Sequence, residues 1–240
     1  MPTTVVLGAG PGLGMSIAHR FGREGHRVAL VSRDATRHAG YLASLAAAGV
    51  DAEAFVADVR DRAQLLSTLD TLTERQHAPE VVYYGPSGLD PETPPTMRDI
   101  TRIDADDARD ALSWLYPAID VVGAVLPGMV ARGGGALLFA GGVSAVTPMP
   151  MLGAMALHSA ALRNYALTLN AALAPQGVYA GTLTIGGLIA RGDIHALVTS
   201  DPRYGVPGTV PTLDPDALAD TLWDLATKRD RPEAVANVVP

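Results

Sequence analysis

The sequence predicts an α/β fold in which a doubly wound parallel sheet of about seven strands carries helices on both faces. Apolar runs of strand length alternate with helical patterns along the chain, and each run is continuous, as in strands buried on both faces. A cluster of glycines connects the first strand to the first helix. These features are typical of a Rossmann fold. The length of 240 residues suits one domain, which we expect to span residues 1–240.

The glycine cluster has the form of a dinucleotide phosphate site. An apolar strand over residues 5–7 is followed by Gly8, Gly12 and Gly14, spaced G-x-x-x-G-x-G, and Leu13 lies at the start of an amphipathic helix. Glycines let the backbone approach phosphate groups closely, and the helix N-terminus offers free N–H groups and a partial positive charge. The spacing differs from G-x-G-x-x-G, but the position between strand and helix favours a nucleotide site over a plain turn.

The remaining elements are expected in regular alternation. Strands are predicted at residues 28–32, 54–57, 80–84, 135–140, 178–185 and 234–239, the last as an edge strand. Helices are predicted at residues 35–48, 61–72, 106–129 (with possible kinks at Pro117 and Pro127), 151–174 and 215–227. Residues 85–96 are expected to form a loop, and residues 186–211 a loop-rich insertion with one helical turn near 194–198. We expect the sheet order 3-2-1-4-5-6-7.

Composition narrows the classes of partner. The formal net charge is −7 and no run of Lys or Arg occurs, which argues against nucleic acid and anionic membranes. The absence of cysteine excludes disulfides, thiolate metal sites and a cysteine nucleophile, and we predict no metal site. Residues 133–162 carry no Asp, Glu, Lys or Arg, but glycines and prolines interrupt them, which fits a buried strand, loop and helix. With no signal peptide evident, we expect a cytoplasmic protein.

The glycine spacing resembles that of the short-chain dehydrogenase/reductase family (SDRs), and the likeness extends over nearly the whole chain. Asp58-Val59 follows the third strand, where the family places an Asp that contacts adenine. Gly85 follows the fourth strand, and Gly186 stands where the family has Pro-Gly after the sixth. The resemblance implies that these residues line a dinucleotide site.

The residues at the end of the second strand indicate which dinucleotide the chain binds. NAD-preferring members of the family have an acidic residue at the position of Ser32, and this chain has Ser32 followed by Arg33. A hydroxyl and a guanidinium suit a 2′-phosphate, so the resemblance implies NADP(H) as the cofactor. The alternative is that Arg33 is a solvated surface charge and Asp34 an N-cap.

The catalytic half departs from the family pattern. Members carry a Ser at the end of the fifth strand and a Tyr-x-x-x-Lys on the following helix; in register, Gly142, Met155 and Ser159 stand in these places. Trp114 falls near the family's Asn on the long central helix, and the one lysine of the chain is Lys228. Methionine cannot donate a proton and serine is not a cation, so the family's standard proton transfer is unavailable.

Three residues are candidate replacements. His158 lies one helical turn from Met155 and its imidazole suits acid–base work, although it is also explained by packing at a subunit contact. Tyr84 ends a central strand, where ligands of open α/β sheets bind. The alternative is that it is a tyrosine packed in the core or against the cofactor. Ser144, just beyond Gly142, could hydrogen-bond a substrate oxygen or be an ordinary loop residue.

Three functions therefore remain open. The chain is an NADP-dependent oxidoreductase for a small carbonyl or imine substrate with a non-standard proton donor, a non-redox enzyme on this fold, or an NADP-binding sensor or partner subunit. We also expect a homodimer or homotetramer, because the helix at 151–174 is rich in alanine around much of its circumference and SDRs pair such helices across a two-fold axis.

Overall fold

The computed structural model describes residues 1–75, 78–86, 98–200 and 211–239. Among these residues, one parallel sheet contains seven strands: Thr3–Leu7 (β1), Arg27–Ser32 (β2), Ala52–Val56 (β3), Val81–Tyr84 (β4), Gly135–Gly142 (β5), Val178–Gly186 (β6) and Glu233–Asn237 (β9). Their order is β3-β2-β1-β4-β5-β6-β9. The predicted Rossmann fold and strand order are confirmed, and β9 is the predicted edge strand.

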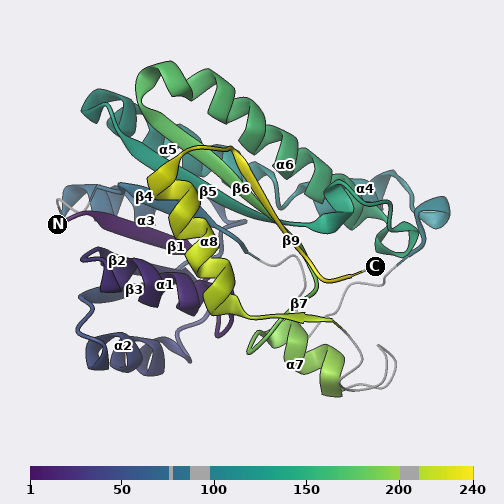
Figure 1. Ribbon diagram of the computed structural model, residues 1–240, viewed down its shortest axis with the longest axis horizontal. Helices are drawn as coiled ribbons and strands as arrows, with labels where there is room; N and C mark the ends of the chain where they lie inside the picture. The colour runs from purple at the N-terminus through teal and green to yellow at the C-terminus, as the bar shows by residue number, and fades with distance from the viewer. Residues whose placement is uncertain (76–77, 87–97, 201–210, 240) are drawn as a thin grey trace.

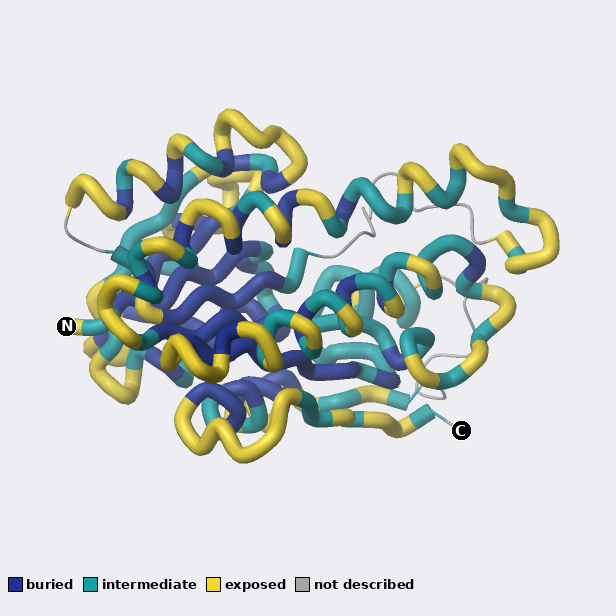
Figure 2. The backbone as a smooth tube through the Cα atoms, turned by 90° about the horizontal axis from the view of Figure 1, so that it is seen from above, coloured by how far each residue is buried: buried dark blue, intermediate teal, exposed yellow. Residues whose placement is uncertain are grey.

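β1 lies near the middle of the sheet because both of its faces are apolar. It pairs in parallel with two strands, so that Val5 is opposite Ala29 of β2 and Val82 of β4. Successive side chains point to opposite faces, and Val5 and Leu7 join one buried cluster while Val6 joins the other. Figure 2 shows the inner strands as the most buried part of the chain. The sheet therefore has a hydrophobic core on each face.

Two layers of helices cover these cores (Figure 1). One layer consists of α3 (Arg62–Glu74), α5 (Tyr116–Arg132) and α6 (Ala154–Leu173), which pack on the face of Val5 and Leu7. The other consists of α1 (Leu13–Arg23), α2 (His38–Ala47) and α8 (Pro215–Lys228). The three-layer arrangement leaves the carboxyl ends of the strands as a common edge where loops meet.

The central helix predicted at residues 106–129 is two helices, α4 (Ala105–Leu112) and α5, with a break at residues 113–115. Pro117 explains the break. It has no N–H to donate to the carbonyl of Ser113, and its ring would clash with that carbonyl in a continuous helix. Pro127 lies inside α5 without ending it. The break places Trp114 in a turn instead of on a helical face.

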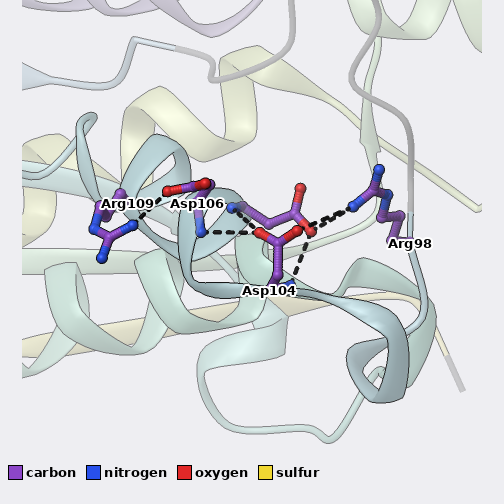
Figure 3. A network of polar contacts seen from close by, with 5 residues as sticks. Arg98, Asp104, Asp106 and Arg109 are labelled. Atoms are coloured by element: carbon purple, nitrogen blue, oxygen red, sulfur yellow. Dashed lines mark hydrogen bonds and ion pairs between the residues drawn. The ribbon is translucent and has the colours of Figure 1, made fainter.

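A network of charges fixes the start of α4 (Figure 3). Asp104 accepts hydrogen bonds from the N–H groups of Asp106 and Asp107, and the Asp107 carboxylate accepts from the N–H of Asp104, which is a reciprocal capping box. The Arg98 guanidinium lies 2.9 Å from the Asp107 carboxylate, and Arg109 pairs with Asp106. These contacts attach the segment before α4 to its first turn.

The insertion after β6 has more structure than expected. It contains a short strand β7 (Leu188–Ile189), a helix α7 (Asp193–Ser200) and a strand β8 (Thr212–Leu213) that pairs in parallel with β7. The predicted helical turn near 194–198 is part of α7. The predicted loop at 85–96 falls mostly on residues 87–97, outside the described residues. α6 begins at Ala154, later than predicted, after Gly153 with φ +49°.

The last strand is attached by a charged contact as well as by its backbone. β9 pairs with β6, and its first residue, Glu233, is opposite Thr182. The Glu233 carboxylate accepts two hydrogen bonds from Arg163 of α6, at 2.7 and 2.6 Å, and one from the Thr184 hydroxyl at 2.8 Å. Bidentate guanidinium–carboxylate pairs are strong and directional. Glu233 therefore joins α6, β6 and β9.

One helical stretch among the described residues, Ala105–Arg132, is long and apolar enough to cross a membrane by length and composition. Its inner face packs into the core below the sheet, where Ala118, Val121 and Val125 are buried. Core helices of folded proteins pass the same test, so this stretch is weak evidence for a membrane segment.

Candidate functional site

The turn after β1 has no room for a side chain at Gly8, Gly12 or Gly14. Gly8 has φ +92°, and a Cβ there would lie 2.8 Å from the Cα of Pro86, just after Gly85 at the end of β4. A Cβ at Gly14 would lie 2.8 Å from the carbonyl oxygen of Gly8. α1 begins between these contacts, at the buried Leu13. The predicted glycines thus bring the ends of β1 and β4 against the N-terminus of α1.

A distant segment also touches this turn. A Cβ at Gly12 would lie 3.1 Å from the Cα of Gly192, so the backbone between β7 and α7 contacts the glycine turn. Arg191 donates a hydrogen bond to the hydroxyl of Ser16 in α1 at 3.0 Å and lies 2.8 Å from the Asp216 carboxylate of α8. Its φ of +65° is unusual for a side chain of this size. These contacts hold the segment over the N-terminus of α1.

The end of β2 is a compact polar turn. The Ser32 hydroxyl donates to the carbonyl of Asp34 at 3.0 Å and lies 2.7 Å from Nε2 of His38. The Asp34 carboxylate accepts from the N–H of Thr36, so it closes this turn and does not cap α2, which begins only at His38. The predicted start of that helix at residue 35 is therefore wrong. Arg33 is exposed beside Ser32.

The sequence analysis missed two residues at this turn, Arg37 and His38. Arg37 precedes α2 and His38 is its first residue. The His38 ring is within hydrogen-bond distance of Ser32. Arg37 lies 2.7 Å from the carboxylate of Asp193 in α7, a residue 156 positions away. That carboxylate and the neighbouring Tyr41 hydroxyl raise the pKa of Arg37, so the guanidinium stays charged. The signal was present: three basic residues follow the second strand within six positions.

The end of β3 lies beside the same turn. The N–H of Ala57 donates to the carbonyl of Ser32 at 3.0 Å. Asp58 follows, half-exposed, and its carboxylate accepts from the N–H of Arg60 at 2.9 Å, while Val59 is buried. The carboxylate therefore shapes its own turn, and its predicted contact with adenine stays a prediction.

At the end of β5, Gly142 lies close to two hydroxyl groups. A Cβ at this position would lie 3.2 Å from Oγ of Ser159 and 3.5 Å from Oγ of Ser144. Ser159 comes from α6 and is buried, whereas Ser144 follows β5 directly. At the end of β6, a Cβ on Gly186 would overlap the Asn237 side chain. The register assigned from the sequence thus brings Gly142, Ser144 and Ser159 together.

His158 precedes Ser159 on α6 and is partly buried. Its Nδ1 atom is buried and has no hydrogen-bond partner among the described residues. Burial lowers the pKa of His158 below its ordinary value of about 6.5, so the imidazole is neutral at neutral pH. A neutral imidazole with an unpaired ring nitrogen can accept or donate one hydrogen bond to a ligand.

Tyr84 has a different setting from the one expected of a proton donor. Its hydroxyl is buried and donates to the carbonyl of Trp114 at 2.6 Å, in the turn between α4 and α5. Burial also raises the pKa of Tyr84. The Trp114 ring is covered by the Arg60 guanidinium, 4.5 Å from the ring centroid. The structure therefore assigns the Tyr84 hydroxyl to the core, where its proton is already used.

These groups are spread along the carboxyl edge of the sheet from β3 to β6, and the strand order reverses between β1 and β4. Open α/β sheets bind ligands at such a point. The N-terminus of α1 lies at this edge, and a partial positive charge there suits a phosphate. No group of three or more His, Cys, Asp or Glu within the described ranges is placed to hold a metal ion.

Comparison with known proteins agrees with this geometry. The sequence model of the family described as short chain dehydrogenase matches residues 2–191. A fruit fly (Drosophila melanogaster) protein named dehydrogenase/reductase SDR family protein 7-like is 26% identical over 248 residues, covering 99% of this chain and 74% of the relative.

Solved structures match over nearly the whole chain. A metagenomic short-chain oxidoreductase in complex with NADP superposes with a TM-score of 0.78 at 18% identity, covering 100% of this chain and 98% of the other. L-sorbose reductase from Gluconobacter frateurii, complexed with NADPH and L-sorbose, gives 0.80 at 19% identity, with 98% and 95% covered. A Sphingobium yanoikuyae short-chain dehydrogenase in complex with NADPH gives 0.79 at 24% identity, with 98% and 87% covered. At these identities, the likeness establishes the fold.

The closeness of the glycine turn gives a stability prediction. We expect Gly8→Ala to lower the free energy of unfolding by about 1–3 kcal/mol, because the new Cβ combines a positive φ with contact to the Pro86 backbone. Gly10→Ala is the matched control, since a Cβ there meets no atom within 4 Å, and we expect a change below about 1 kcal/mol. Urea unfolding of both variants measures this. Equal stability of the two would contradict the steric argument.

Proposed function

Because this chain belongs to the short chain dehydrogenase family, we propose that it is an NADP(H)-dependent oxidoreductase acting on a small carbonyl or imine substrate. The observation that carries the proposal is the contact between two turns: the glycine turn after β1 donates backbone hydrogen bonds to the carbonyl of Val31, next to the basic turn at the end of β2. The description of similar solved structures as complexes with NADP or NADPH supports it. In this proposal, residues 1–240 form one cofactor-binding domain.

The residues present fit a dinucleotide phosphate. We assign the pyrophosphate to the turn of Gly8, Gly12 and Gly14 and to the N–H of Leu13, because a Cβ at these glycines would meet backbone atoms and the first N–H groups of α1 have no helical acceptor. Gly85 closes the other side of this turn.

The adenosine end follows from the neighbouring strands. Ser32 and Arg33 would hold the ribose 2′-phosphate, and Asp58 with Val59 would border the adenine, because β2 and β3 end side by side. Gly186, at the end of β6, would lie near the nicotinamide half. When bound, the nicotinamide supplies or accepts a hydride.

The proton donor must differ from the family's arrangement. In the register of the likeness, Gly142, Met155 and Ser159 occupy the positions of the family's Ser, Tyr and Lys. We propose that the hydroxyls of Ser144 and Ser159, which both lie close to Gly142, orient a substrate oxygen or nitrogen. Neither is acidic enough to replace a tyrosine with a lowered pKa.

We propose His158 as the first candidate for the acid and rank Tyr84 below it. The His158 imidazole has an unpaired buried nitrogen, whereas the Tyr84 proton is bonded to the Trp114 carbonyl. Because burial lowers the pKa of His158, only acidic solution supplies the imidazolium. A substrate that already carries its charge, such as an iminium ion, needs no donor.

The same observations favour a second candidate function, an NADP-binding sensor or partner subunit without catalysis. A neutral imidazole, an engaged tyrosine and two ordinary hydroxyls leave no strong acid at neutral pH. Conversion of NADPH in the presence of a broad carbonyl and imine panel separates the two. A third candidate, non-redox chemistry on this fold, predicts product formation without NADPH oxidation.

We also propose a homodimer or homotetramer that pairs α5 and α6. The exposed residues of α5 from Tyr116 to Ala131 are uncharged and include Tyr116 (56% exposed) and Ile119 (44%). Those of α6 from Leu157 onward are also uncharged. A helix with apolar residues outside its core-facing stripe is suited to a second buried contact.

The cofactor assignment predicts a preference. Wild-type protein should bind NADPH more tightly than NADH, and Arg33→Ala should weaken NADPH by about ten- to a hundredfold, or roughly 1.5–3 kcal/mol, since a charge-assisted contact to the phosphate is lost. NADH affinity should be unchanged. Titration of both cofactors by fluorescence or calorimetry measures this. Equal wild-type affinities would remove Arg33 from the site.

The acid assignment predicts a pH profile. If the panel yields a substrate that needs a proton, its reduction should slow as pH rises through a value below 6.5, because the imidazolium of His158 is lost there. His158→Gln should lower turnover by about 10²- to 10⁴-fold and leave NADPH affinity intact. A flat pH profile together with wild-type turnover in this variant would show that His158 only packs.

The proposed homo-oligomer predicts the mass of the protein in solution. Light scattering at micromolar concentration should give a dimer or tetramer, and Ile119→Asp should shift it toward the monomer because a buried unpaired charge is costly. Val56→Asp, at an exposed apolar position on β3 (55%, against 44% for Ile119), is the control and should leave the mass unchanged. A wild-type monomer would refute the proposal.

A further inference from the structure

The segment that leads into α7 contacts two parts of the proposed cofactor site. At one end, Gly192 contacts Gly12 in the phosphate turn. At the other, Asp193 pairs with Arg37, at the start of α2. The ion pair therefore connects the insertion after β6 with the polar turn after β2, two parts of the chain that share no strand pairing.

α7 is connected to the rest of this insertion by a sharp turn of the backbone at Arg191 and Gly192. β7 is fixed by its pairing with β8 and by Arg191, which contacts Ser16 and Asp216. Arg191 itself has φ +65° and is followed by Gly192, so the chain turns sharply just before α7. Beyond this turn, the Arg37–Asp193 pair is a side-chain tie between α7 and α2. Figure 1 shows α7 outside the sheet, below the carboxyl end of β9.

Arg37 is also close to where a ribose 2′-phosphate is proposed to lie. Its neighbour His38 touches the Ser32 hydroxyl at 2.7 Å, which puts the start of α2 against the end of β2. Arg37 and Asp193 are both partly exposed, with 55% and 38% of their side chains accessible. A phosphate at Ser32 and Arg33 would thus be within the range of a flexible arginine side chain four residues further on.

We propose that Arg37 is a second specificity residue for the 2′-phosphate, and that it exchanges Asp193 for the phosphate, so that NADP(H) but not NAD(H) releases α7 from α2. This inference rests on the proposed NADP(H) function. A phosphate dianion offers three acceptor oxygens and more charge than a carboxylate, and guanidinium binds both in the same bidentate manner. An exposed carboxylate–guanidinium pair is weak, so the phosphate can displace it.

Affinity measurements test the exchange. We expect Arg37→Ala to weaken NADPH at least tenfold and to leave NADH within twofold. Asp193→Asn removes the competing charge and keeps the shape, and should tighten NADPH by about two- to fivefold without changing NADH. In the double variant, the gain from Asp193→Asn should vanish. Arg75→Ala and Glu53→Gln, a pair at 3.0 Å near the amino end of β3 and away from the proposed phosphate position, are the control variants.

Hydrogen–deuterium exchange tests the release of α7. With each cofactor at saturation, amides of α7 should exchange faster in the NADPH complex than in the NADH complex, since the two ligands differ only by the 2′-phosphate. Asp193→Asn should abolish this difference by raising exchange with NADH to the NADPH level. A variant that only damaged packing would raise exchange in both complexes and would also accelerate it in α8.

The outcomes are distinct. If wild type does not bind NADPH, the proposed function fails. If it binds NADPH through Arg33 but Arg37→Ala leaves the affinity unchanged, the second specificity role alone is overturned. Weaker NADPH binding by Asp193→Asn, or equal α7 exchange with both cofactors in wild type, overturns the exchange of partners.

Discussion

The lack of space at the turn after β1 is the constraint on which the candidate site depends. A Cβ at Gly8 would meet the Pro86 backbone, and one at Gly14 would meet the Gly8 carbonyl. Because neither residue has a side chain, the ends of β1 and β4 can approach the first turn of α1, whose N–H groups then face the carboxyl edge of the sheet. At Gly12, the missing side chain likewise lets the backbone of Gly192, after β7, approach the turn. The geometry of a phosphate site thus follows from three missing methyl groups.

The two halves of the site are built by different means. The phosphate half consists of backbone, which does not depend on the identity of distant side chains. The proposed chemical half consists of side chains from separate elements: Ser144 after β5, and Ser159 and His158 from α6. One nitrogen of the His158 imidazole is buried with no partner among the described residues. A low-dielectric setting strengthens any hydrogen bond that a ligand brings to it.

The sequence predicted the parts that depend on local pattern. Continuous apolar runs identified the strands because a sheet covered on both faces buries every side chain. The strand order followed from the strand–helix alternation together with the dinucleotide-type turn after the first strand. The break at residues 113–115 could have been placed from Pro117, since its missing N–H removes the bond to Ser113. The pairing of Arg37 with Asp193 could not, because it joins residues 156 positions apart and no periodicity encodes it. The burial of His158 likewise depends on packing around α6 that only the folded chain defines.

The attachment of β9 has a consequence for the chain during synthesis. Until Glu233 and the strand it begins have been made, β6 has no neighbour on its outer side, and its backbone N–H and C=O groups form an open edge. Such an edge is a template for pairing with another chain, so nascent or truncated molecules are prone to aggregate at this point. The bidentate contact from Arg163 favours rapid capture of the strand once it emerges, because α6 already presents the guanidinium beside the vacant edge.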